Sequence, residues 1–129
     1  MKKNPLGIVV KSCVAVNENP NMADFKGHHW QVTLYNPRNR RRMSVYFSMG
    51  YGHNGKEPTA DDVLSCVSGD SDCADYSSFE EWADEHGYDT DSRKAERTYN
   101  TCIKEGRKLA QFINSNEDME ALREWAQEY

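Results

Sequence analysis

The stretch "HWQVTLYNPRNRRRMSVYFS", residues 29–48, decides the fold of this chain. Apolar and polar residues alternate along both halves, which is typical of two β-strands that each turn one face to a core. The apolar positions are Trp30, Val32, Leu34, Met43, Val45 and Phe47. Both sets must face the same core, because a shift of one residue would turn one of them to solvent. The pattern therefore predicts an antiparallel hairpin in which Leu34 lies opposite Met43 and Tyr35 lies opposite Arg42.

The turn of this hairpin concentrates positive charge. The register leaves residues 37–40 as a four-residue turn, in which Pro37 suits the first corner and Asn39 tolerates less common backbone angles. Guanidinium groups bind phosphates bidentately, and Tyr35 or Tyr46 can stack on a base. The alternative is a solvated tip whose charges prevent edge-to-edge aggregation. The basic candidates at the tip and on the solvent face beside it are Arg38, Arg40, Arg41 and Arg42.

Residues 7–16 are rich in β-branched side chains and predict a first strand, with Lys11 on its solvent face. The positions that share the core-facing parity are Ile8, Val10, Val14 and Val16. After residue 57 the pattern becomes helical, with Gly69 and Gly87 as stops for two short helices. The expected N-caps of four helices are Thr59, Ser78, Thr90 or Asp91, and Ser115 or Asn116.

The longest helix is expected to pack on the sheet. Its apolar stripe consists of Ala95, Tyr99, Cys102, Ile103, Gly106, Leu109, Ala110 and Ile113. The last helix is expected to bury Met119, Leu122 and Trp125. Strands first and helices second indicate an α+β fold, with a small N-terminal antiparallel sheet of three strands packed by three to four C-terminal helices. The length favours one domain over residues 1–129.

The net charge of −5 conceals an uneven distribution. Residues 1–56 hold nine Lys/Arg and two Asp/Glu, whereas residues 57–91 hold twelve Asp/Glu and no Lys/Arg. Carboxylates on short helices and loops can imitate the phosphates of a nucleic acid and occupy a basic groove on a partner. The alternative is a solvated surface, with acids favoured locally at helix N-termini. The acidic candidates are Asp70, Asp72, Asp75, Glu80, Glu81 and Asp84.

Patterns of catalytic and metal-binding residues are sparse. His28 and His29 are adjacent, so on a strand they point to opposite faces and cannot both bind one ion. Residues 70–81 have part of the spacing of a calcium loop, but Asp75 stands where that loop needs glycine. The four cysteines fit no zinc or redox spacing and are expected to be reduced thiols. We therefore expect no enzyme activity, no cofactor and no metal.

Several motifs between Trp30 and Ile113 resemble a family of small, largely uncharacterised accessory proteins of tailed phages and prophages. The shared pattern is a strand ending in "FSMG", a "PTADDVL" helix, then "FEEW", "GYDTDSRKA" and a later "TY". No activity carries over from that family. The resemblance implies a context, because such proteins often inhibit host defence systems, including CRISPR effectors, by binding them directly.

The expected function is accordingly non-enzymatic inhibition of a host defence complex such as a CRISPR effector, with the acidic residues competing for a nucleic-acid-binding site. The alternative is a small DNA- or RNA-binding protein that acts through the arginine hairpin and Tyr35. No apolar run reaches the length of a membrane span, so no membrane partner is expected. The expected location is the cytoplasm of an infected or lysogenic bacterial host, and the partner's identity and the oligomeric state stay open.

Overall fold

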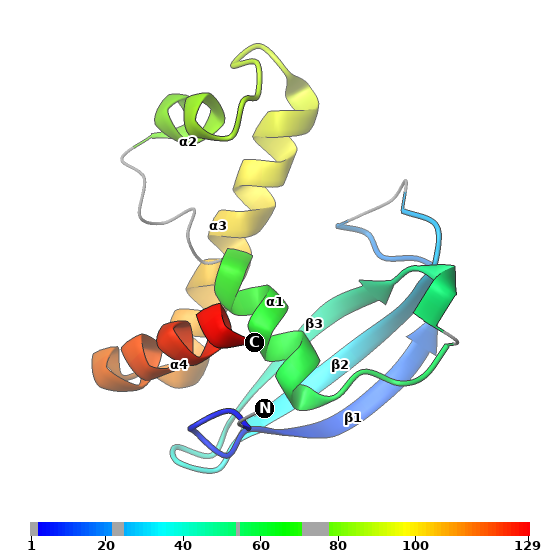
Figure 1. Ribbon diagram of the computed structural model, residues 1–129, viewed down its shortest axis with the longest axis vertical. Coiled ribbons are helices and arrows are strands. Elements are labelled where there is room, and N and C mark those ends of the chain that lie inside the picture. The colour runs from blue at the N-terminus through cyan, green and yellow to red at the C-terminus, as the bar shows by residue number, and fades with distance from the viewer. Residues whose placement is uncertain (1–2, 22–24, 54, 71–77) are drawn as a thin grey trace.

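The computed structural model describes residues 3–21, 25–53, 55–70 and 78–129, and Figure 1 shows a three-stranded sheet followed by helices. The strands are β1 (Val9–Val16), β2 (His28–Asn36) and β3 (Arg41–Met49), paired antiparallel in the order β1-β2-β3. A short 3₁₀ helix, η1 (Tyr51–His53), precedes α1 (Ala60–Asp70), α2 (Phe79–Glu85), α3 (Arg93–Ile113) and α4 (Asn116–Glu128). The predicted α+β class is confirmed.

The hairpin of β2 and β3 has the predicted register. Leu34 pairs with Met43 and Tyr35 pairs with Arg42, which leaves residues 37–40 as the turn. The left-handed backbone angle falls on Arg40, with φ of 63°, and not on Asn39 as expected. The side chain of Asn39 instead donates hydrogen bonds to the C-terminal end of α3.

Strand β1 departs from the predicted parity after Val10. Lys11 is an extra residue between two consecutive paired positions, which is a β-bulge. The bulge exchanges the two faces of the strand, so that Cys13 packs against the core while Val14 is 56% exposed. The predicted core positions of Val14 and Val16 are therefore wrong, because alternation cannot anticipate an inserted residue.

The main core lies on one face of the sheet, beneath α1, α4 and the C-terminal half of α3 (Figure 1). Each large apolar side chain buried there stabilises the fold by about 1.5–3 kcal/mol relative to an exposed one. The fully or nearly fully buried members include Trp30, Val32, Leu34, Met43, Val45, Val63, Leu64, Leu109, Phe112, Ile113 and Leu122. Phe47 and Met119 are partly buried at its border.

The N-terminal half of α3 extends past the sheet and carries a second, smaller core with α2 (Figure 1). Trp82, Ala83 and Ala95 are buried in it, and the rings of Trp82 and Tyr99 lie 5.3 Å apart between centroids. Partly buried Phe79, Tyr99, Cys102 and Ile103 complete the cluster. The expectation that the whole stripe of α3 packs on the sheet is therefore wrong for its first half. Ala110 is also exposed, and Phe112 is buried instead.

Helix starts follow local capping chemistry. Ser78, Ser92 and Ser115 each accept a hydrogen bond from the backbone N–H three residues on, which confirms the expected caps of α2 and α4. The cap of α3 is Ser92, and not Thr90 or Asp91, because the helix begins at Arg93 and the Ser92 hydroxyl accepts from the N–H of Ala95 at 3.2 Å. Helix α1 continues one residue past the predicted stop at Gly69.

None of the helices in the described ranges combines the length and the apolar character needed to cross a bilayer.

Candidate functional site

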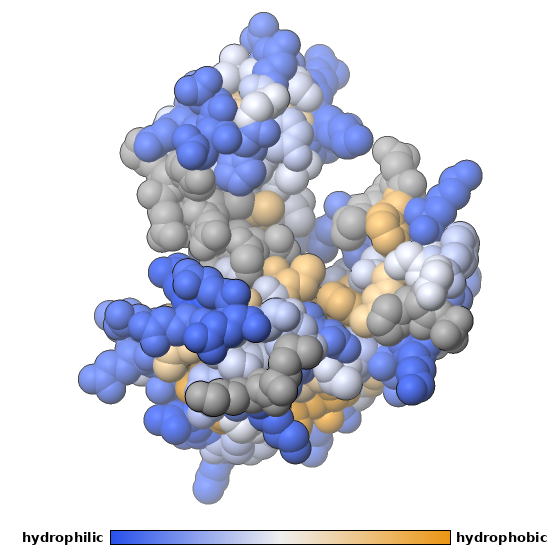
Figure 2. Space-filling view, viewed as in Figure 1, coloured by the Kyte–Doolittle hydropathy of each residue, from blue (hydrophilic) through white to orange (hydrophobic). Residues whose placement is uncertain are grey.

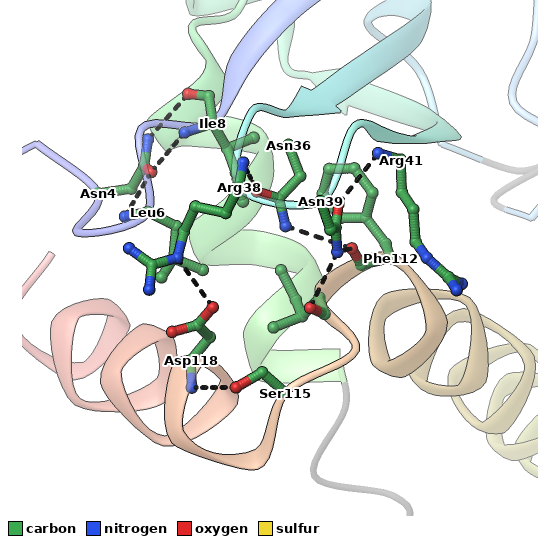
Figure 3. A network of polar contacts seen from close by, with 11 residues as sticks. Asn4, Leu6, Ile8, Asn36, Arg38, Asn39, Arg41, Phe112, Ser115 and Asp118 are labelled. Carbon is green, nitrogen blue, oxygen red and sulfur yellow. Dashed lines mark hydrogen bonds and ion pairs between the residues drawn. The ribbon is translucent and has the colours of Figure 1, made fainter.

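The tip of the hairpin is fixed to the C-terminal end of α3 by two asparagines (Figure 3). The side-chain amide of Asn39 donates to the carbonyl oxygens of Phe112 at 2.9 Å and Ile113 at 3.1 Å. Fully buried Asn36 donates to the same Phe112 carbonyl at 3.3 Å and accepts from the N–H of Arg38 at 3.0 Å. The last carbonyls of a helix have no partner inside it, so these bonds satisfy groups that would otherwise be buried unpaired. The joint holds β3 beside α3.

The four predicted arginines do not form one surface. The Nε of Arg38 lies 3.0 Å from a carboxylate oxygen of Asp118 in the first turn of α4, and Figure 3 shows this pair beside the turn. Arg41 extends toward α3, where its guanidinium donates to the Gln111 carbonyl at 3.0 Å. Arg40 is exposed at the tip. Arg42 is exposed too, and its side chain forms no hydrogen bond or ion pair among the described residues.

One surface pocket lies between β3 and α3, and a second adjoins it along the surface of α3 alone, sharing Lys108 and Gln111 with the first. We call them together the basic groove. The α3 wall, from Asn100 to Gln111, is about 16 Å long at 1.5 Å per residue. Among the described residues, no carboxylate lines either pocket. The cations that line the groove are Arg41, Arg42, Lys104, Arg107 and Lys108.

Lys108 is the residue where the two pockets meet. Its ammonium nitrogen lies 3.4 Å from the carbonyl oxygen of Ser44 on β3 and 3.6 Å from Glu105 Oε1. Glu105 is only 9% exposed, so one carboxylate beneath the groove offsets part of its positive charge. The lysine is thereby held over the outer edge of β3, which has no further strand beside it in the described part of the sheet.

Sequence reasoning missed the α3 side of this groove. The signal was present, since Lys104 and Lys108 lie one turn apart and Arg107 is adjacent to the second. Nothing local to that helix indicates that a hairpin more than sixty residues earlier lies against it. The expected Tyr35 is placed on the solvent face of the sheet, half-buried and opposite Arg42.

The acidic candidates are divided. Glu80, Glu81 and Asp84 are exposed on α2, which lies at the end of α3 remote from the sheet (Figure 1). Figure 2 shows hydrophilic side chains over that end of the molecule. Asp70 is the last residue of α1 and its side chain, like the whole of Asp72 and Asp75, lies outside the described residues. The structure therefore brings together half of the predicted set.

Other polar groups have structural partners. His29 Nδ1 lies 2.7 Å from the hydroxyl of Ser48, which also accepts from Asn19 at 2.9 Å. The pKa of the Cys13 thiol is raised above its ordinary value, mainly by burial and to a smaller extent by the negative charge of Glu57. Within the described ranges, no three His, Cys, Asp or Glu side chains converge as ligands of one metal ion would.

Comparison with known proteins finds no matching family model, no matching curated protein and no matching solved structure. Any function of this chain is therefore inferred from the side chains of its own surface.

Proposed function

We propose that this protein binds nucleic acid and that the basic groove holds the phosphate backbone. The observation that carries the proposal is the convergence of Arg42 from β3 and Lys108 from α3 on one pocket, in which none of the described lining residues is a carboxylate. Contacts between phosphates and Lys or Arg supply most of the affinity of sequence-independent binding. The groove extends this pocket along α3 to Lys104 and Arg107, so several phosphates of one strand fit along it.

The net charge of −5 does not oppose this binding at close range. Acidic helix α2 contacts α3 near Tyr99, whose ring lies 5.3 Å from that of Trp82. Lys108 follows Tyr99 by nine residues, or about 13 Å along the helix. Screening in salt of physiological strength acts over about 8 Å, so exposed carboxylates on α2 act weakly at the hairpin end of the groove. The local field there is set by the arginines and lysines, reduced in part by the carboxylate of Glu105.

Charge-removing substitutions test this proposal. The variant Arg42→Gln/Lys108→Gln takes two cations from the groove, and neither side chain is part of a core. The matched control, Lys26→Gln/Lys56→Gln, removes the same charge from exposed residues outside the groove. We expect fluorescence anisotropy with a labelled oligonucleotide to show at least about tenfold weaker binding for the groove variant, and no change for the control. Equal losses in both variants, or no binding by the native protein at low salt, would contradict the proposal.

A second candidate function rests on the acidic end. Helix α2 is anchored by its own aromatic cluster and presents Glu80, Glu81 and Asp84 to solvent, a placement that suits insertion into a basic groove on another protein. Together with the phage-type motifs, this supports inhibition of a bacterial defence complex such as a CRISPR effector. Here the partner would be captured from a nuclease-treated host lysate, and capture would be lost with Glu80→Gln/Glu81→Gln/Asp84→Asn. Capture that the amides leave unchanged would reject the acidic mechanism.

A further inference from the structure

The sheet has a solvent face that no helix covers in the described part of the chain (Figure 1). The strand register places three consecutive residue pairs of β2 and β3 on that face. They are Tyr35 with Arg42, Thr33 with Ser44, and Gln31 with Tyr46. Tyr46 is 37% exposed, a large exposure for an aromatic ring in the interior of a strand.

One cation lies over the first tyrosine ring, and the residue paired with that tyrosine across the strands carries a second. The ammonium nitrogen of Lys11 lies 5.7 Å from the centroid of Tyr35, a position that the β-bulge of β1 gives it. Arg42 lies directly opposite Tyr35 on the other neighbouring strand. An aromatic ring with cationic residues on both neighbouring strands suits a ligand with a flat π-face and a negative charge close to it.

The residue pair between the two tyrosines consists of Thr33 and Ser44. The hydroxyls of Thr33 and Ser44 hydrogen bond to each other at 2.8 Å across the strands. Tyr46 follows Arg42 by four residues, which is about 13 Å along the strand. The face therefore offers two separated rings, with a hydrogen-bonded pair of hydroxyl groups between them.

This face and the basic groove meet along the edge strand β3. Arg42 and Ser44 belong to the outer-face pairs, and both also line the groove. A backbone held in the pocket at Arg42 and Ser44 therefore runs beside the face. A base attached to it reaches Tyr46 on β3 itself and reaches Tyr35 by crossing β3. Only unpaired bases have free π-faces, since those of a duplex are stacked inside it.

Resting on the proposed function, we infer that the ligand is single-stranded nucleic acid whose bases stack on Tyr35 and Tyr46 while its phosphates occupy the basic groove. The charge of this face indicates the class of ligand that it binds. Lys11 and Arg42 favour a polyanion over an apolar peptide.

The test compares single-stranded DNA, single-stranded RNA and duplex DNA of one length, at one salt concentration, with native protein and the variant Tyr35→Leu/Tyr46→Leu. We expect tighter binding of either single strand than of the duplex. The leucine variant should bind single strands at least about tenfold more weakly and bind the duplex as the native protein does. Tyr35→Phe/Tyr46→Phe keeps both rings and should retain single-strand affinity within about twofold. Tyr51→Leu, which alters a 67% exposed tyrosine outside the three pairs, is the matched control.

The outcomes separate this inference from the proposed function. If the leucine variant keeps its single-strand affinity while Arg42→Gln/Lys108→Gln loses it, the groove binds nucleic acid and the stacking face is rejected. Equal affinity of the native protein for single strands and duplex rejects the stacking face as well. Binding of none of the three ligands rejects both proposals.

Discussion

The side-chain nitrogen of Asn39 lies 2.9 Å from the carbonyl oxygen of Phe112, which comes 73 residues later in the chain. A residue of a β-turn therefore caps the C-terminal end of a helix that is distant in sequence. The neighbouring Ile113 carbonyl accepts from the same amide at 3.1 Å. This joint helps to hold α3 beside β3, and the pocket that Arg42 and Lys108 line lies between these two elements.

Loss of this cap should destabilise the protein. Asn39→Ala leaves the two carbonyls with fewer donors and should lower the free energy of unfolding by about 1–3 kcal/mol in urea titrations. Asn39→Asp keeps an acceptor for the Arg41 N–H, 3.0 Å away, but turns an oxygen toward the carbonyls, and should cost at least as much. A change below about 0.3 kcal/mol for both variants would mean that the joint is not formed in solution.

The backbone at Arg40 predicts a difference between two variants that remove the same charge. Its φ of 63° is the left-handed region, which costs a residue with a Cβ roughly 1–2 kcal/mol and costs glycine little. Arg40→Gly should therefore be more stable than Arg40→Ala by about 1 kcal/mol in the same urea titration. Equal stabilities would show that this turn has another conformation.

The two separate cores predict two kinds of response to truncation. Leu34→Ala, in the main core, should cost about 2–5 kcal/mol and weaken hydrogen-exchange protection throughout the chain. Trp82→Ala removes the centre of the second core and should release protection in α2 and the first half of α3, while β2 and β3 stay protected. Uniform loss of protection in the Trp82 variant would indicate one cooperative core.

The phenol of Tyr129 predicts an effect of alkaline pH. Its O–H donates to the carboxylate of Asp62, and this hydrogen bond is the main reason why the pKa of Tyr129 is raised, with burial second. The stabilising contribution is therefore complete below the ordinary tyrosine pKa of about 10 and is lost as pH rises through the raised pKa of the folded state. In an absorbance titration, Tyr129→Phe should remove one tyrosine whose pKa lies above the ordinary value. Loss of a tyrosine with an ordinary pKa would contradict the contact.

The hairpin could be predicted because its two strands each carry a complete two-residue period, and only one register turns both apolar sets to one side. The bulge at Lys11 could not, since an inserted residue leaves no mark in a run of β-branched side chains. The path of α3 was only half predicted: its apolar stripe is continuous in sequence, but the stripe contacts the sheet at one end and α2 at the other.

The candidate site could also be predicted only in part, because some of its residues are placed by local sequence patterns and others by contacts that are distant in sequence. Arg42 and Tyr35 follow from strand alternation. The contribution of Lys104, Arg107 and Lys108 depends on where α3 lies. That position is set by contacts far apart in the sequence, namely the burial of Leu109, Phe112 and Ile113 in the main core and the hydrogen bonds of Asn36 and Asn39.

The dependence of binding on salt tests the central claim most directly. Single-stranded ligands release counterions with a slope of about −0.7 per neutralised phosphate in a plot of log K against log salt concentration, so five groove cations give a slope of about −3.5. Arg42→Gln/Lys108→Gln should make the slope shallower by about 1.4, while Lys26→Gln/Lys56→Gln should leave it unchanged. A native slope near zero, or the same slope in the native protein and the groove variant, would contradict phosphate binding in the basic groove.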